Sequence, residues 1–184
     1  MASCNNVTLT GINAKCDTSA GGIKRVLIAQ KDDVKKIDVD KRDAEHPDGT
    51  EVINAIEMET GKYFVQWLFR KNTGNYSTSL TSDPAIGAQA VTTDLNLQFT
   101  KAEATKRLEI QSAINAAAVV IIEDMYGQYI LLGLDNEVTV TQVNQQSGTA
   151  ISDLNGYTLT LQDVSLELPH FVDPDIISGL LTAE

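Results

Sequence analysis

The sequence of 184 residues fits one globular domain, and its hydrophobic content of 42% is sufficient for a packed core. A formal net charge of −11 repels nucleic-acid phosphates and argues against a basic DNA-binding module. No apolar run reaches the length of about eighteen residues that predicts a membrane-spanning helix. The start Met1-Ala-Ser-Cys4 lacks the regions of a signal peptide, so we expect synthesis in the cytoplasm.

The two cysteines, Cys4 and Cys16, both lie near the start of the sequence. Their spacing and the absence of nearby His or further Cys match neither a zinc site nor a redox dithiol. We interpret them as free thiols of a reducing compartment, with a disulfide between them as the lesser alternative.

The first predicted strand runs from Ile23 to Ala29, after a turn at Gly21-Gly22. Residues 31–51 then carry a dense mixture of acidic and basic side chains and include Pro47-Asp48-Gly49. This composition predicts a solvated, charged loop, with room for a short edge strand.

The next region predicts a hairpin with strands at Ile53–Met58 and Tyr63–Arg70 and a turn at residues 59–61. By the period of two, we expect one face of the second strand to point to the core through Tyr63, Val65, Trp67 and Phe69. The following strand, Tyr76–Thr81, is polar enough for the edge of a sheet.

Strict alternation of apolar and polar residues over Val91–Phe99 predicts a strand with one face in water. Thr100 and Glu103 have the spacing of a capping box, which predicts a helix over residues 100–118. The expected buried face of this helix carries Ile110, Ile114 and Ala117.

Two apolar runs, Val119–Ile122 and Tyr129–Leu132, predict a hairpin of fully buried strands, and another strand is expected at Glu137–Val143. The last long strand, Tyr157–Leu168, changes the phase of its apolar residues near Gln162-Asp163. Such a reversal predicts a bulge or a change of sheet.

The C-terminal tail, residues 169–184, holds a small group of apolar residues. They predict a short amphipathic turn that docks on this subunit or on a neighbour. The residues of this group are Ile176, Ile177, Leu180 and Leu181.

The sequence offers little that resembles catalytic chemistry. His46 and His170 have no local motif that supplies a nucleophile, and we interpret both as surface imidazoles. The run Asp38–Asp43 resembles a calcium loop, but Arg42 stands at a ligand position and Asp43 where glycine is needed. We therefore expect no enzyme, no cofactor and no metal site.

Together these elements predict one mainly β domain over residues 1–184, a sandwich or barrel with one flanking helix. Its sheet edges suit pairing with further copies. If copies closed into a ring, the wet strand faces would line a water-filled lumen, and an acidic lining would let DNA pass without binding. The candidate lumen residues are Asp94, Asn96, Gln98, Thr158, Thr160 and Gln162.

Several segments occur in an order that resembles the phage tail tube proteins. They are Gly21–Ala29, Leu95–Phe99, Lys106-Arg107-Leu108, Ile122–Asp124 with Gly127–Tyr129 and Leu132-Gly133, and Gly148-Thr149 followed by Asp153–Thr160. The last of these is the closest match, and the whole resemblance covers about two-thirds of the chain in order. The chain departs from the family pattern at Gln162-Asp163-Val164, where Gly-Glu-Glu is expected.

The resemblance implies a fold similar to that of phage tail tubes and type VI secretion tubes. It also implies a virion protein whose hexameric rings stack into a DNA conduit and contact other tail or neck proteins, without specific DNA binding. A neck or tail-completion protein that forms a single ring is the alternative within this class.

A carbohydrate- or receptor-binding β-domain is the alternative from another class, with Tyr63, Trp67 and Tyr76 as its aromatic platform. For a stacked tube, the length and mixed charges of the 31–51 loop lead us to expect the contacts between rings there. The candidate residues are Asp32, Asp33, Asp38, Asp40, Lys41, Arg42 and Asp43.

Overall fold

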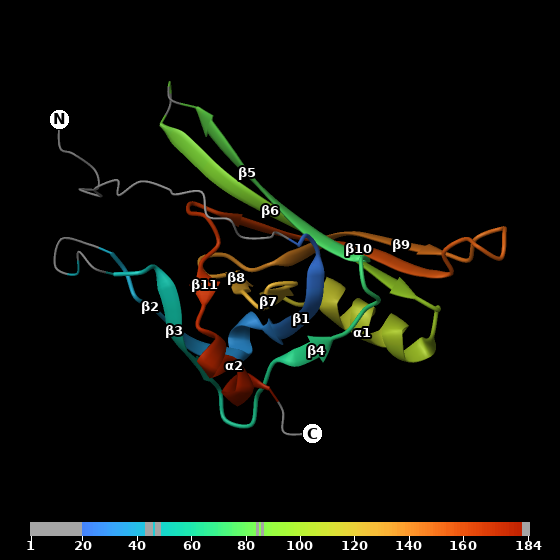
Figure 1. The fold of residues 1–184 in the computed structure, drawn as a ribbon, viewed down its shortest axis with the longest axis horizontal. Helices are drawn as coiled ribbons and strands as arrows, with labels where there is room; N and C mark the ends of the chain where they lie inside the picture. Colours follow the sequence, from blue (N-terminus) through green and yellow to red (C-terminus); the bar gives the residue numbers. More distant parts are fainter. Residues whose placement is uncertain (1–19, 43–45, 47–48, 84, 86, 182–184) are drawn as a thin grey trace.

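The computed structural model describes residues 20–42, 46, 49–83, 85 and 87–181. Within them the chain is mainly β, with a seven-stranded sheet, a four-stranded sheet and two α-helices (Figure 1). One cluster of buried residues draws its members from both sheets, which therefore pack face to face. The predicted mainly β sandwich with a flanking helix is confirmed.

The seven-stranded sheet has the order β2-β3-β11-β8-β7-β1-β4. Its strands are β1 (Ile23–Gln30), β2 (Val34–Val39), β3 (Val52–Met58), β4 (Val65–Trp67), β7 (Ala118–Asp124), β8 (Tyr129–Leu132) and β11 (Phe171–Val172). In β7, Val120 and Ile122 face the four-stranded sheet, whereas Val119 and Ile121 face the opposite side. Burial on both faces explains the continuous apolar run in this strand.

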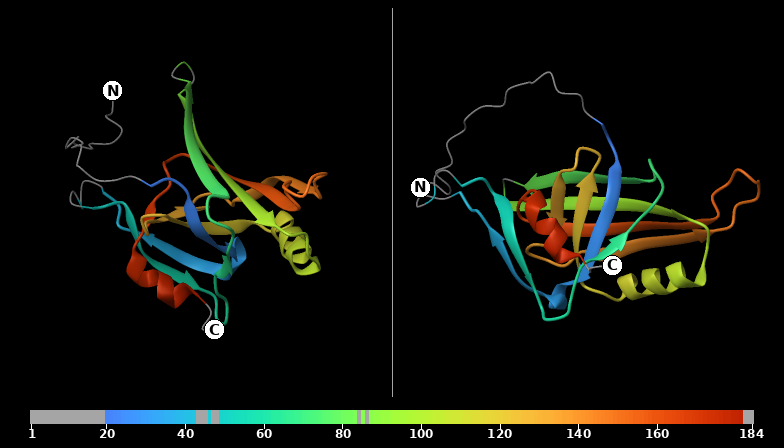
Figure 2. Two further views of the ribbon diagram at one scale, coloured as in Figure 1. Left: turned by 45° about the vertical axis from the view of Figure 1, so that its right-hand side comes forward. Right: turned by 60° about the horizontal axis from the view of Figure 1, so that its bottom comes forward.

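The four-stranded sheet is antiparallel and has the order β5-β6-β10-β9. Its strands are β5 (Gly74–Asp83), β6 (Ala88–Thr100), β9 (Thr139–Gln146) and β10 (Gly156–Ser165). One face packs on the other sheet through Leu95, Leu97, Leu159 and Leu161, all buried. The hairpin of β5 and β6 extends beyond the body of the domain (Figures 1 and 2).

Helix α1 (Ala104–Ile114) is shorter at both ends than the predicted helix over residues 100–118. The capping box is wrong because Thr100 is the last residue of β6, where Gly156 is its partner in β10. Glu103 is the N-cap residue instead, and its side chain makes no capping hydrogen bond. Ile110 is buried as expected, but Ile114 is exposed.

The C-terminal tail docks on its own subunit, which is one of the two alternatives that the sequence predicted. It forms β11 and then α2 (Pro174–Leu180), a second helix that the sequence indicated only as a turn. Asp173 caps α2 by accepting a hydrogen bond from the Asp175 backbone N–H at 3.0 Å. Ile177 and Leu180 are buried against the face of the seven-stranded sheet that lies away from the four-stranded sheet.

The predicted 31–51 loop is wrong in extent, because it begins with a 3₁₀ turn at Lys31–Asp33 and continues as β2. β2 lies at the edge of the seven-stranded sheet, so the edge strand that the prediction allowed is present. After β2, the Asp40 carboxylate accepts hydrogen bonds from the backbone N–H and the hydroxyl of Thr50. These hydrogen bonds lower the pKa of Asp40.

The hairpin predicted from residues 53–70 is wrong, because β3 pairs with β2 and β11 whereas β4 pairs with β1. The segment between them is anchored by Phe64, which is fully buried and donates its backbone N–H to the Leu180 carbonyl at 2.9 Å. Tyr63 and Val65, expected in the core, are about half exposed, with relative exposures of 47% and 52%.

The predicted phase reversal in the last long strand is also wrong. Asp163 is buried on the same face as Leu161, and the pairing of β10 with β6 continues without a shift to Ser165. The pairing of β10 with β9 shifts register between Thr160 and Leu161, and the extra residue is Thr141 on β9. The apolar residues that suggested the reversal, Val164, Leu166 and Leu168, are exposed instead.

Candidate functional site

All six candidate lumen residues lie on the face of the four-stranded sheet that points away from the sandwich core. The register pairs Asp94 with Gln162, Asn96 with Thr160, and Gln98 with Thr158, so the residues form three rows across β6 and β10. Hydrogen bonds of 2.8 Å join Gln162 Nε2 to Asp94 Oδ1 and Thr160 Oγ1 to Asn96 Oδ1. We refer to this surface as the polar face.

The edge strands β5 and β9 continue these rows with residues that the sequence reasoning did not single out. In β5, Ser77 stands beside Asp94 and Asn75 beside Asn96. In β9, Gln142 stands beside Thr160 and Asn144 beside Thr158. A register shift on β9 leaves Thr141 unpaired, which breaks the simple alternation that marks a strand in a sequence.

Charge on the polar face is sparse and of one sign. The chain holds 14 Lys and Arg, yet none occurs in β5, β6, β9 or β10. Asp94 lies in the middle of the face and Asp83 at the exposed end of β5. The sequence led us to expect an acidic lining, but the surface is mostly uncharged and polar with few carboxylates, and its strands offer no cation to a phosphate group.

Asp163 points from β10 into the sandwich and is the buried carboxyl of this region, with a relative exposure of 3%. It accepts a hydrogen bond from the Gly133 backbone N–H, but within the described residues its Oδ1 atom has no partner. Burial raises the pKa of Asp163, and the Gly133 hydrogen bond opposes this only in part. Nearby, Lys31 Nζ donates to the carbonyls of Gly133 and Leu134, and burial lowers its pKa.

Because the pKa of Asp163 is raised, we predict that the free energy of unfolding decreases as the pH rises. A carboxyl group whose pKa is higher in the folded chain than in the unfolded chain adds most to the free energy of unfolding at pH values below its pKa in the unfolded chain. This stabilisation is lost as the pH rises through its pKa in the folded chain. Asp163→Asn, which cannot ionise, should therefore be more stable than the wild type at pH 8 by about 1 kcal/mol or more.

Urea unfolding at pH 5 and pH 8 measures this difference, which should shrink at the lower pH. Asp32→Asn, at an exposed carboxyl, is the control and should change stability little at either pH. A less stable Asp163→Asn protein at pH 8 would show that the ionised carboxylate is well accommodated.

A second buried carboxylate, Glu123 of β7, is paired with Lys24 and Arg25 of β1. Burial acts to raise the pKa of Glu123, but the hydrogen bonds and charges of these two bases outweigh it, so the pKa is lowered. This group joins two neighbouring strands and lies away from the polar face. We interpret it as a structural ion pair.

The two histidines differ in their surroundings. His46 is exposed as expected, but the His170 side chain is only 10% exposed, so its interpretation as a surface imidazole is wrong. Its Nδ1 atom lies 3.0 Å from the Glu51 carbonyl and its Nε2 atom 3.5 Å from the Glu167 carboxylate. His170 borders an open cleft of about 440 Å³ that Leu166, Leu168 and Phe171 also line.

The candidate ring-contact residues are spread over several elements. Asp32 and Asp33 lie in the 3₁₀ turn, Asp38 in β2, and Asp40, Lys41 and Arg42 in the connection after it, while Asp43 falls outside the described residues. Asp33 is paired with Lys62 at 3.0 Å and Asp38 with Lys36 at 2.6 Å. The six described residues therefore lie in β2, at the edge of the seven-stranded sheet, and in the segments before and after it, not in one loop.

The aromatic platform is not assembled. Trp67 is buried and packs edge-on against Phe99, with ring centroids 5.6 Å apart. Tyr76 points from β5 toward the core, whereas Tyr63 is exposed near β4. These positions leave no shared face on which the three rings could meet a sugar.

Within the described residues, no three His, Cys, Asp or Glu side chains are grouped so as to hold a metal ion. Cys4 and Cys16 fall outside those residues. No helix that the structure describes is long and apolar enough to cross a membrane. Comparison with protein-family models, with curated proteins and with solved structures gave no match.

Proposed function

We propose that this chain is a structural virion protein that forms hexameric rings, stacked as a phage tail tube through which DNA passes. The polar face carries the proposal. It is a broad sheet surface with no Lys or Arg in any of its four strands, in a chain whose net charge is −11. A duplex that slides along such a surface meets no cation that would hold its phosphates.

The edges of the four-stranded sheet supply the means of ring closure. β5 and β9, of 10 and 8 residues, are its two edge strands and lie on opposite sides. Pairing of β5 in one copy with β9 in the next joins two different surfaces, and such a contact closes into a ring when the rotation between copies closes. The sheets of the ring then form one continuous wall.

In the proposed ring, the layer order favours an inward position for the polar face. The seven-stranded sheet covers the opposite face of the four-stranded sheet and needs the larger circumference. The polar face therefore lines the lumen. Barrels of about 16 to 18 strands already enclose an aqueous channel, and six four-stranded sheets exceed that number.

Electron microscopy of the purified chain at high concentration, with a mass measurement, tests the proposal. We expect open-ended tubes with a central channel. A single ring of defined mass would instead support the neck or tail-completion alternative. A protein that stays monomeric in solution and is absent from virions would contradict both.

A further inference from the structure

The loop at residues 147–155, between β9 and β10, presents one apolar side chain to solvent. Ile151 has a relative exposure of 107%, the highest of any large apolar residue described. The loop around it is ordered by Asp153, whose carboxylate accepts hydrogen bonds from the backbone N–H groups of Thr149 and Ala150 at 2.9 and 2.8 Å. Contact with an apolar surface of another chain would remove this side chain from water, which is favourable.

The 440 Å³ cleft beside His170 is lined by further exposed apolar residues. Leu166 and Leu168 have relative exposures of 66% and 67%, and Phe171 of 48%. The chain enters β10 from the Ile151 loop at Gly156 and leaves it toward the cleft at Ser165. The loop at residues 147–155 and the segment at residues 166–171 therefore lie at opposite ends of β10 (Figure 1), and the ten residues of that strand keep Ile151 from the cleft of its own chain.

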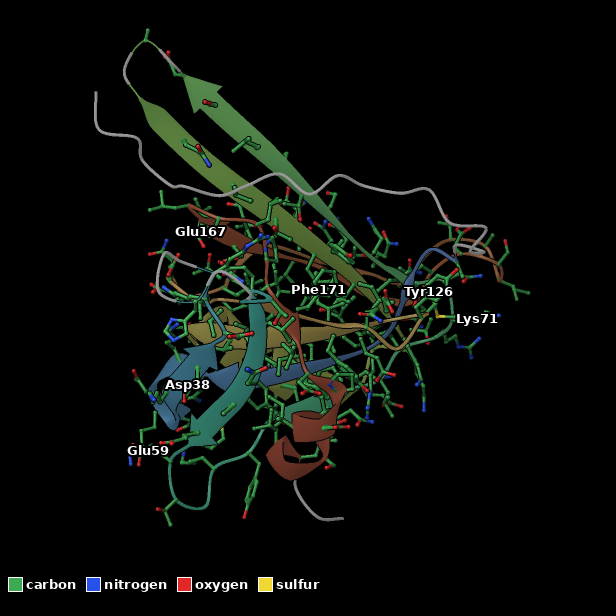
Figure 3. The ribbon with its side chains drawn as sticks, turned by 60° about the vertical axis from the view of Figure 1, so that its left-hand side comes forward. Asp38, Glu59, Lys71, Tyr126, Glu167 and Phe171 are labelled. Carbon is green, nitrogen blue, oxygen red and sulfur yellow. The ribbon has the colours of Figure 1, made fainter. Side chains whose placement is uncertain are left out.

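The two ends also differ in charge. The turns beside the Ile151 loop carry the basic residues Arg70, Lys71 and Lys101, of which Lys101 is paired with Glu103, and the loop itself carries the carboxylate of Asp153. The described parts of the opposite turns, residues 83–88, 133–139 and 165–170, hold no Lys or Arg themselves, and the basic group bound to them is Lys31, which donates to the Gly133 and Leu134 carbonyls. Their carboxylates are Asp83, Asp135, Glu137 and Glu167. Lys71 and Glu167 lie on opposite sides of the molecule in Figure 3.

We propose that Ile151 of one copy inserts into the cleft at Leu166, Leu168 and Phe171 of a second copy, so that copies stack end to end. Burial of Ile151 and attraction between the oppositely charged ends both favour the orientation in which the Ile151 end of one copy meets the cleft end of the next. Because loop and cleft are different surfaces, the contact leaves one of each free and extends without limit.

This inference rests on the proposed function, since it names the contact that stacks one ring on the next. It also limits the part of residues 31–51 that we expect to take part in stacking. Thr50 and Glu51, at the end of that segment, line the cleft, whereas Asp32, Asp33 and Asp38 do not. The stacking surface is therefore centred on residues 166–171.

Cysteine crosslinking tests the contact without requiring a ring. Ile151→Cys and Leu168→Cys are placed in separate full-length chains in which Cys4 and Cys16 are replaced by Ser. Under mild oxidation we expect a crosslinked dimer that contains one chain of each kind when the two are mixed. Equal crosslinking of each variant with itself, or no mixed dimer, would overturn the inference.

Aspartate substitutions test the consequence for assembly. Ile151→Asp and Leu168→Asp should each raise the concentration at which stacks appear by roughly tenfold or more, while single rings persist. Ile151→Leu should stack like the wild type. Leu108→Asp is the matched control, at an α1 residue with a relative exposure of 60%, and should stack normally.

The failures of the two proposals are distinguishable. If Ile151→Asp rings stack at the wild-type concentration, the inference is wrong and the ring proposal stands. If no ring forms but the mixed cysteine chains crosslink, the ring proposal fails and the end-to-end contact stands.

Discussion

Tubes built from the double variant Gln142→Lys and Asn144→Lys should retain linear double-stranded DNA at about 50 mM salt, whereas wild-type tubes should let it pass. Both side chains are exposed on β9 and belong to the polar face, so the substitutions place cations in the proposed lumen without disturbing the core. We expect an affinity at least about tenfold above that of the wild type, decreasing steeply as salt rises.

The measurement compares linear DNA with covalently closed circular DNA. A duplex reaches the lumen only by threading from an end, so the lumen variant should bind linear DNA and leave circles free. The matched control is the double variant Gln111→Lys and Ser112→Lys, at exposed positions of α1. It should retain linear and circular DNA equally. Equal retention of circles and linear DNA by the β9 variant would place the polar face on the outside.

Gly156→Ala should cause the largest loss of stability among single substitutions at the described glycines. A Cβ atom at Gly156 would lie 2.0 Å from the Phe99 carbonyl oxygen and 3.0 Å from its carbon. Both are backbone atoms of β6, the direct partner of β10, and no side-chain movement can relieve the overlap. We expect a loss of about 3 kcal/mol or more, since the two strands must separate locally.

Urea unfolding measures this loss as a lower midpoint. Gly21→Ala makes the same chemical change where no atom lies within 4 Å of the added Cβ, and it should leave the midpoint nearly unchanged. A midpoint for Gly156→Ala equal to that of Gly21→Ala would mean that β6 and β10 are less closely paired than described.

The two proposals assign separate tasks to separate parts of the four-stranded sheet. The polar face is free of basic residues and suits contact with passing DNA, while the two ends of the strands carry the apolar and charged groups. A sheet divided in this way can be inert toward DNA along its face and still bind other copies at its ends. Changes at Gln142 and at Ile151 should therefore affect different measurements.

The sequence predicted the elements whose pattern is local. The alternation in Val91–Phe99 identified β6 and its polar side, because a strand that is wet on one face repeats every two residues. The continuous apolar runs at residues 119–122 and 129–132 identified the buried hairpin for a similar reason. Alternation placed Asp94, Asn96 and Gln98 on one side of β6 and Thr158, Thr160 and Gln162 on one side of β10, but only the pairing of β6 with β10 joins the two sides into one face.

Strand pairing was decided by the tertiary structure, because hydrogen bonds between strands join residues far apart in the chain. β3 and β4 are neighbours in sequence, yet the parallel partner of β3 is β11, formed about 120 residues later. The capping box failed for the same reason. Thr100 was already paired with Gly156 in the sheet and was not available to begin a helix.

Asp163 shows most clearly what the sequence determined and what only the tertiary structure decided. The sequence predicted a long strand over residues 157–168, of which residues 157–165 belong to β10, and it predicted a bulge or a change of sheet near Gln162-Asp163 in place of a buried carboxyl at Asp163. In the folded chain the pairing of β10 with β6 and the backbone N–H of Gly133 hold Asp163 inside. The leucines beyond it are thereby turned outward, where they form the proposed docking cleft.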